Sequence, residues 1–246
     1  METHAHHLHN APGKNFWHYF FEFFMLFIAV FCGFLAENFR EHQVEKDREK
    51  VYIRNLYEDL KSDTAIYSAY TKSTNEFLSR IDSLFMFMKS PERKAHLNRI
   101  YFLARTATMR TTSIHPNDRT FDQMKHAGLL RLISYQQVAD SVSSYYNSLN
   151  LLPSQSEVIR ERSSDYMAEM GKIFDAEILF RILKEGKEPS LGTLRLLTDD
   201  PLEINQLLAK AQYYYGSCKI QTNYVRIRTN HARILIELIK KEYHLE

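Results

Sequence analysis

An apolar run near the N-terminus, FWHYFFEFFMLFIAVFCGFLA over residues 16–36, constrains this chain more than any other feature. Its uninterrupted part, residues 23–36, would form about 21 Å of helix, which is shorter than the ~30 Å hydrocarbon core of a bilayer. Extended back to Phe16, the run would form about 31 Å of helix. Its strongly polar members are then His18 and Glu22. The sequence therefore predicts a transmembrane helix over residues 16–36.

A cleaved signal peptide is the competing interpretation of this run. Cleavage needs small residues at the −3 and −1 positions after the apolar core, and Phe31 and Phe34 stand in that region instead. A lipoprotein signal ending at Cys32 would need a small residue where Phe31 lies. We therefore expect an uncleaved anchor, with Trp17 and Tyr19 at the membrane interface.

The side chains of this segment sort into two faces at about 100° per residue. One face carries the polar and small residues, and the opposite face carries phenylalanines. Ala29 and Gly33 on the first face form a small-xxx-small pair, which would let two membrane helices approach closely. We expect the segment to pack through His18, Glu22, Ala29 and Gly33 against another membrane helix, in a homo-oligomer or in a partner membrane protein. The polar stripe consists of His18, Glu22, Met25, Ala29, Gly33, Ala36 and Arg40, and the phenylalanine face of Phe20, Phe24, Phe27, Phe31 and Phe34.

Glu22 is the unusual member of the polar stripe, because an ionised carboxylate at its depth costs several kcal/mol. Protonation, or a pair with His18 one turn away, would lower that cost. Three roles stay open: a hydrogen bond to a neighbouring helix, a side chain that reaches to the N-terminal interface, and a proton or ion relay.

The anchor predicts a single-pass protein of the cell inner membrane, and the side on which its C-terminal part lies stays open. Lys14 precedes the span, whereas five basic residues follow it closely, which by the positive-inside rule favours the cytoplasm for the C-terminal part. These five are Arg40, Lys46, Arg48, Lys50 and Arg54.

Few helix-breaking residues occur in the rest of the chain. Seven glycines and six prolines among 246 residues favour long helices over many short strands. Residues 37–50 are almost all charged or polar, so the membrane helix is expected to continue as a charged helical stalk. Apolar residues recur at helical spacing from Ile53 onwards, which predicts an α-helical bundle domain over residues 51–246. Residues 1–15 are expected to form a disordered tail containing histidines, with weak divalent-metal binding as the alternative.

Start and stop signals divide the bundle domain into helices. Pro91 after Ser90 marks a stop and a restart, and Asp200-Pro201 marks the start of the last helix. Further expected N-caps are Thr120, Ser134 and Ser154, and further expected breakers are Gly128, Pro153 and Gly186. Helices are predicted near 45–89, 92–110, 120–127, 135–151, 155–184 and 201–244. The predicted fold class is all-α: one transmembrane helix, a stalk, and an antiparallel bundle of about four long helices plus a short helix.

Composition and motifs exclude several classes of function. A net charge of +2 with scattered Lys and Arg gives no footprint for nucleic acid. Two cysteines define no disulfide framework, and the chain has no Cys/His zinc spacing, phosphate loop or nucleophile elbow. We therefore expect no enzyme activity, no cofactor and no metal site.

The bundle offers two groups of candidate ligand or interface residues. His115, Asp118 and His126 lie in an irregular polar stretch, and loops on a rigid scaffold often carry binding residues. Turn formation and core packing would account for the same stretch. Tyr145, Tyr146 and Tyr214 would line a ligand pocket or an interface, or else pack in the core with their hydroxyls at its boundary.

Three segments carry a resemblance to a known family: FWHYFFEFFMLFIAVFCGFLAENFREH, EKDREKVYIRNLYEDLKSD, and TFDQMKHAGLLRLIS followed by SSYYN. They resemble a family of single-pass membrane proteins from Bacteroidota, which has a membrane helix with a Glu in its first half and a charged exit containing Asn. An α-helical domain with an F-[DE]-x-[ML]-K…G-x-L-R-L-I segment follows. The matching residues are Glu22, Asn38, Phe121, Lys125, Gly128 and Leu130 to Ile133.

The resemblance covers roughly residues 14–150 and implies the same architecture, but it supplies no activity. Many relatives have a more basic N-terminal tail, which implies a periplasmic helical domain. This chain differs from those relatives, because Lys14 is its only Lys or Arg residue before the span. Both orientations therefore stay open.

Three functions are compatible with these features. The first is a non-enzymatic, membrane-anchored interaction or scaffold protein that self-associates or binds a partner through its membrane helix. The alternative is a membrane-anchored sensor whose bundle binds a small ligand, which a deep cavity near Tyr145 or Tyr213 would favour. The third is a membrane-bound hydrolase, which would require His115, Asp118 and His126 to converge within hydrogen-bonding distance.

Overall fold

The computed structural model describes residues 16–108, 113–190, 192 and 194–245, so the predicted tail over residues 1–15 lies outside the described residues. Within the described ranges the chain is helical and has no strand, which confirms the all-α class. The chain divides into two compact units, residues 1–51 and 52–246.

The first helix, α1, runs without interruption from Phe16 to Lys89 over 74 residues. No Gly or Pro occurs after Gly33 in this stretch, so nothing in the sequence interrupts its backbone hydrogen bonds. The N-terminal part of α1 is long and apolar enough to cross a membrane, and none of that apolar stretch is buried inside the protein. The predicted helical continuation of the apolar segment through residues 37–50 is thus present, and the helix ends at Lys89.

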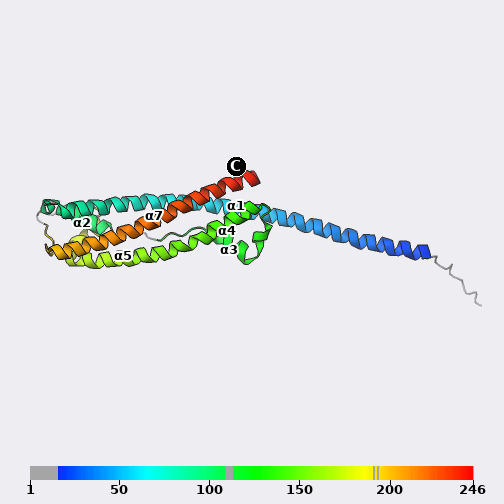
Figure 1. The fold of residues 1–246 in the computed structure, drawn as a ribbon, viewed down its shortest axis with the longest axis horizontal. Coiled ribbons are helices and arrows are strands. Elements are labelled where there is room, and N and C mark those ends of the chain that lie inside the picture. Colours follow the sequence, from blue (N-terminus) through cyan, green and yellow to red (C-terminus); the bar gives the residue numbers. More distant parts are fainter. Residues whose placement is uncertain (1–15, 109–112, 191, 193, 246) are drawn as a thin grey trace, which may run out of the picture. The chain divides into compact units, whose positions relative to one another are not determined.

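The remaining elements follow α1 in the chain and are shown in Figure 1. They are the 3₁₀ turn η1 (Arg93–His96), α2 (Leu97–Thr106), α3 (Arg119–His126), η2 (Leu129–Leu132), α4 (Gln136–Asn147), η3 (Ser148–Asn150), α5 (Leu151–Ile173), α6 (Ala176–Glu185) and α7 (Pro201–Tyr243).

Three long helices, α1, α5 and α7, form the body of the second unit (Figure 1). The helix α7 is antiparallel to α5, because Lys210 contacts Asp165 while Gln221, further along α7, contacts Ser156, which lies earlier in α5. It is also antiparallel to α1, since Tyr214 packs on Phe77 and Gln221 bonds to Tyr70. The fourth position of the bundle is shared by α2 at one end and by α3 and α4 at the other (Figure 1).

The core of the bundle consists of two apolar clusters. One contains residues of α1 from Phe77 to Met88 together with α2 and the adjoining parts of α5 and α7. The other contains residues of α1 from Ile53 to Tyr70 together with α3, α4 and the C-terminal part of α7.

A buried polar layer lies where the two clusters meet. The Tyr70 hydroxyl donates to Oε1 of Gln221 at 2.5 Å, and Nε2 of Gln221 donates to Oγ of Ser156 at 2.8 Å. Gln221 is completely buried, so these bonds satisfy an amide that would otherwise be costly to remove from water. The layer links α1, α5 and α7 and specifies their register, since sliding any helix would leave the Gln221 amide unpaired.

Two predicted helix boundaries are wrong. The predicted helix 155–184 is divided into α5 and α6 at Phe174, whose backbone is extended with φ −108 and ψ 137. Asp175 then caps α6, because its Oδ1 accepts hydrogen bonds from the backbone N–H groups of Glu177 at 2.8 Å and Ile178 at 3.4 Å. Pro153 does not break a helix, since it lies in the first turn of α5, where an N–H group has no helical partner.

The other terminus signals have mixed outcomes. Asp200 caps α7 through a bond from the N–H group of Leu202 at 3.0 Å, as predicted. Gly128 and Gly186 adopt left-handed φ angles of 66° and 67° beyond the ends of α3 and α6, which also agrees with prediction. However, α3, α4 and α5 begin at Arg119, Gln136 and Leu151 rather than after Thr120, Ser134 and Ser154.

Candidate functional site: the membrane-helix face and a buried carboxylate

The phenylalanine face is formed within the apolar N-terminal segment of α1, residues 16–36. The rings of Phe20 and Phe24 stack with centroids 6.1 Å apart, and those of Phe27 and Phe31 stack at 6.0 Å. All four rings are substantially exposed, as is every residue of the span. Such a face suits contact with lipid, because lipid tails remove apolar side chains from water without any protein partner.

The polar stripe lies on the opposite side of the same helix. His18, Glu22, Ala29 and Gly33 are all exposed in this unit, so the fold itself covers none of the predicted packing residues. Within the described residues, no hydrogen bond or ion pair joins Glu22 to His18 or to any other group. Apart from the chain neighbours of Gly33 and the backbone of its own helix, no described heavy atom lies within 4 Å of the position that a Cβ at Gly33 would take. The stripe is therefore an open surface for a second helix.

A fully buried carboxylate, Asp63, forms the most densely bonded polar cluster of the second unit. Its Oδ1 accepts from the backbone N–H of Asn117 at 2.7 Å and from Nδ2 of Asn117 at 2.9 Å. Its Oδ2 accepts from the Tyr145 hydroxyl at 2.6 Å, and that hydroxyl lies 3.1 Å from the hydroxyl of Tyr67. We name Asp63, Tyr67, Asn117 and Tyr145 the Asp63 cluster.

Burial dominates the electrostatics of this cluster. Desolvation raises the pKa of Asp63, while the hydrogen bonds from Tyr145 and Asn117 lower it and the neighbouring Asp59 adds a smaller upward effect. Burial also raises the pKa values of Tyr67 and Tyr145, so both phenols stay protonated and can donate.

The Asp63 cluster holds three separate segments together. Asp63 and Tyr67 come from α1, Tyr145 comes from α4, and Asn117 comes from the irregular segment that precedes α3. Because the Asn117 backbone itself donates to Asp63, this bond fixes the path of the segment and not merely one side chain. The Tyr145 hydroxyl is engaged on both sides, by Asp63 and Tyr67, and Tyr145 also lines a groove of about 340 Å³ together with His231 and Leu235.

The other candidate tyrosines have different surroundings. Tyr214 is buried and packs on Phe77 and Tyr166, with ring centroids 4.7 and 6.3 Å away. Tyr146 is also buried and stacks on Phe121 at 4.5 Å, but among the described residues its hydroxyl has no hydrogen-bond partner. Tyr146 contributes to the wall of a pocket of about 240 Å³, whose further lining residues include Asp118, Asp122, Lys125 and Asn147.

The candidates His115, Asp118 and His126 are all exposed, and the described structure shows no hydrogen bond between any two of them. Asp118 lines the Tyr146 pocket, whereas neither histidine does. The described part of the chain also holds no group of three or more His, Cys, Asp or Glu side chains placed to bind a metal ion. The convergence that the hydrolase hypothesis requires is therefore not formed.

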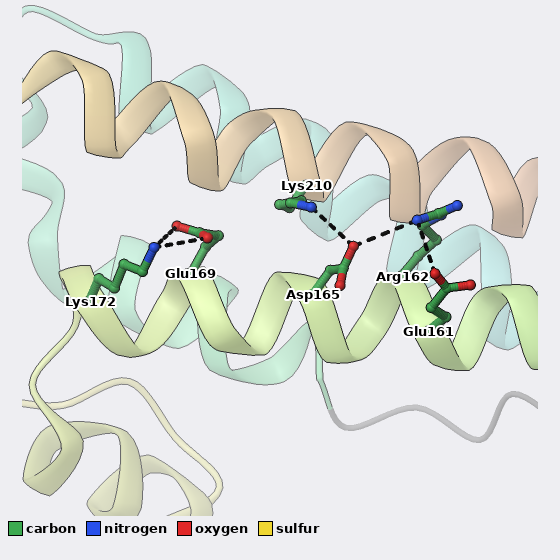
Figure 2. A network of polar contacts seen from close by, with 6 residues as sticks. All are labelled: Glu161, Arg162, Asp165, Glu169, Lys172 and Lys210. Atoms are coloured by element: carbon green, nitrogen blue, oxygen red, sulfur yellow. Dashed lines mark hydrogen bonds and ion pairs between the residues drawn. The ribbon is translucent and has the colours of Figure 1, made fainter.

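A surface network of charges crosses from α5 to α7 (Figure 2). Asp165 Oδ2 lies 3.0 Å from Nζ of Lys210 and 3.6 Å from a guanidinium nitrogen of Arg162. These side chains are about a third or more exposed, and solvent-exposed pairs of this kind contribute little to stability. The network therefore lies at the α5–α7 contact but contributes little to its stability.

The sequence reasoning missed Asp63, although a signal was present. The core positions of α1 follow three- and four-residue steps, and Asp63 lies three residues after Leu60 and four before Tyr67, both buried. An acid at such a position must be paired when the helix packs.

No protein-family model matches the sequence, and no curated protein or solved structure matches it.

Proposed function

We propose that this chain is a membrane-anchored helical scaffold protein that acts through protein contacts. It would be inserted once in the cell inner membrane and associate through the polar stripe, with another copy of itself or with the helix of a partner membrane protein. It would perform no catalysis. The resemblance to the single-pass Bacteroidota family supports the same architecture.

One observation carries this proposal: the apolar segment of α1 has two unlike faces and no packing partner among the described residues of its own unit. The phenylalanine face suits lipid, while Ala29 and Gly33 leave room for a close helix and Glu22 offers a hydrogen-bonding group. An acid in the membrane is expensive when it has no partner, so a second helix that accepts its hydrogen bond would offset that cost. A plain lipid anchor would need neither feature.

The proposal is tested with single substitutions on the two faces of the full chain in detergent. Gly33→Leu would fill the space needed for close approach, and Glu22→Leu would remove the hydrogen bond, so each should weaken association about tenfold or more. Phe27→Leu, on the opposite face, is the matched control and should leave association unchanged. Analytical ultracentrifugation gives the constants. Equal oligomer size for Gly33→Leu, Glu22→Leu and the unaltered chain would refute the proposal.

A second candidate, the membrane-anchored sensor, is supported by the Tyr146 pocket. Its lining combines Tyr146 with the polar side chains of Asp118, Asp122 and Lys125. The Tyr146 hydroxyl is buried and has no described hydrogen-bond partner, so a small polar ligand would bond to it only after the pocket wall shifts. A thermal-shift screen of small polar metabolites tests it, with Tyr146→Phe as the matched variant. A ligand that stabilises the unaltered chain but not Tyr146→Phe would favour sensing, and the absence of any such ligand would argue for the scaffold.

A further inference from the structure

A seven-residue repeat lies in the second half of α7. Residues 220–234 read IQTNYVRIRTNHARI, so the pattern I-x-T-N-x-x-R occurs twice and a third Ile follows. In a helix, residues seven apart lie on one face, and sustained heptads are the signature of a coiled-coil contact. The repeat therefore gives α7 a periodic face in addition to the one that packs in the bundle.

The two faces of the repeat differ in burial. Gln221, Val225, Ala232 and Leu235 are buried against the rest of the bundle. In contrast, Ile220, Ile227 and Ile234 are 50%, 38% and 68% exposed, and Tyr213, one heptad earlier, is 60% exposed. Single exposed apolar residues are common, but a row of four at constant spacing extends over about 31 Å of helix.

Polar residues complete this exposed face. Asn223 and Asn230 each follow an isoleucine by three residues, and both are exposed. An Ile row alternating with Asn has the heptad spacing of an a/d seam, with isoleucine at a and asparagine at d. We name Tyr213, Ile220, Asn223, Ile227, Asn230 and Ile234 the outer seam of α7.

We propose that the outer seam of α7 pairs in parallel with the outer seam of a second copy of this chain. The parallel direction rests in part on the proposed membrane anchoring, because copies inserted in the same orientation present their bundles on the same side of the membrane. The isoleucines of the two copies would meet in layers, and each asparagine would face its counterpart.

The charges beside the outer seam favour the parallel direction independently. A basic residue directly precedes each isoleucine: Lys219, Arg226 and Arg233. In an antiparallel pair the basic flanks of the two copies would face each other and repel. In a parallel pair each basic flank instead faces the flank on the other side of the isoleucine row in the second copy.

That other flank consists of Tyr224, His231 and Leu238, so it carries no Lys or Arg side chain. It carries His231, which together with Ile234 and with Asp140 of α4 lines a groove of about 340 Å³. In a parallel coiled coil a residue on the first flank lies opposite the residue five positions further on in the second copy. Arg226 would thus lie opposite His231, at the groove that contains the Asp140 carboxylate.

Cysteine cross-linking of the full chain in membranes tests the pairing and its direction. The background is Cys32→Ala, and Cys218 is retained because it is completely buried. Ile220→Cys and Ile234→Cys should each form a disulfide with the same residue of a second copy. Ser164→Cys, at an exposed position of α5, is the matched control and should not cross-link. Cross-linking only in a mixture of Ile220→Cys and Ile234→Cys chains, or no cross-linking above the control, would overturn the proposal.

A second measurement separates this inference from the proposed function. In the same background, Ala29→Cys reports the membrane-helix contact, so a disulfide at Ala29→Cys without one at Ile220→Cys would overturn the outer-seam pairing and leave the proposed function standing. The reverse result would support the seam and count against the membrane stripe.

Ile220→Lys with Ile227→Lys should weaken self-association about tenfold. Met86→Lys, which changes an exposed apolar residue of α1, should leave it unaltered, and equal effects of the two changes would overturn the seam.

Discussion

Removing the Asp63 carboxylate should destabilise the bundle by an amount that depends on whether a hydrogen-bond acceptor is left. In Asp63→Leu the N–H and Nδ2 donors of Asn117 lose their acceptor, while the Tyr145 hydroxyl can turn to Tyr67, 3.1 Å away. A stranded buried donor costs about 1–3 kcal/mol, so two such donors predict a loss of about 2–6 kcal/mol, towards the lower end because Asn117 is only partly buried. Asp63→Asn keeps an oxygen for Asn117 and offers an amide to Tyr145, so it should cost only about 1 kcal/mol.

The comparison with Asp63→Asn also predicts a pH dependence. Burial raises the pKa of Asp63, so the folded chain keeps this proton to a higher pH than the unfolded chain does. The free energy of unfolding of the unaltered chain should therefore fall relative to that of Asp63→Asn as the pH rises above about 4 and through the folded pKa. Above that value the difference should stay constant.

Urea unfolding in detergent, followed by the near-ultraviolet circular dichroism of the buried tyrosines, measures both effects. The assay compares the unaltered chain, Asp63→Asn and Asp63→Leu at several values of pH between about 4 and 8. Equal losses for the two variants would show that the hydrogen bonds to Asn117 contribute nothing. A gap between the unaltered chain and Asp63→Asn that widens in favour of the unaltered chain as the pH rises would refute the stated electrostatics.

Three further changes have defined expectations. Gly186→Ala forces a side chain into a left-handed conformation with φ 67°, so it should lower the free energy of unfolding by about 1 kcal/mol, measured by urea unfolding. Tyr146→Phe removes a buried hydroxyl that has no partner among the described residues, so the melting temperature should stay equal or rise, and a clear fall would contradict the unpaired state. Lys210→Met breaks the exposed pair with Asp165 and should lower the free energy of unfolding by at most about 1 kcal/mol. A larger loss, measured by thermal unfolding, would contradict the small contribution expected of an exposed ion pair.

The sequence was sufficient to predict the α1 helix because its determinants are local. The absence of Gly and Pro after Gly33 allows one helix to continue to Lys89, and Ser90-Pro91 ends it. The same local chemistry predicted the Asp200 cap and the left-handed glycines. The break between α5 and α6 was missed because Phe174 and Asp175 carry no helix-breaking side chain, and the extended conformation at Phe174 accompanies its burial in the core.

The candidate site was predictable only where it depends on a single helix. The polar stripe and the phenylalanine face follow from helical periodicity alone. The Asp63 cluster depends on pairings between residues 54 and 82 positions apart, which no local pattern contains. The sequence therefore indicates Tyr145 without its partner. His115 and His126 were predicted site residues only because they stand in a polar stretch, and the structure places His126 at the end of α3 and exposes both side chains.

Site-specific photo-cross-linking along the membrane segment in native membranes tests the central claim most directly. A photoreactive residue is placed in turn at positions 22, 25, 29 and 33 of the polar stripe and at positions 20, 24, 27 and 31 of the phenylalanine face. The proposed function predicts protein adducts from the stripe and lipid adducts from the phenylalanine face, with helical periodicity. Adducts to protein without periodicity, or lipid adducts from every position, would contradict it.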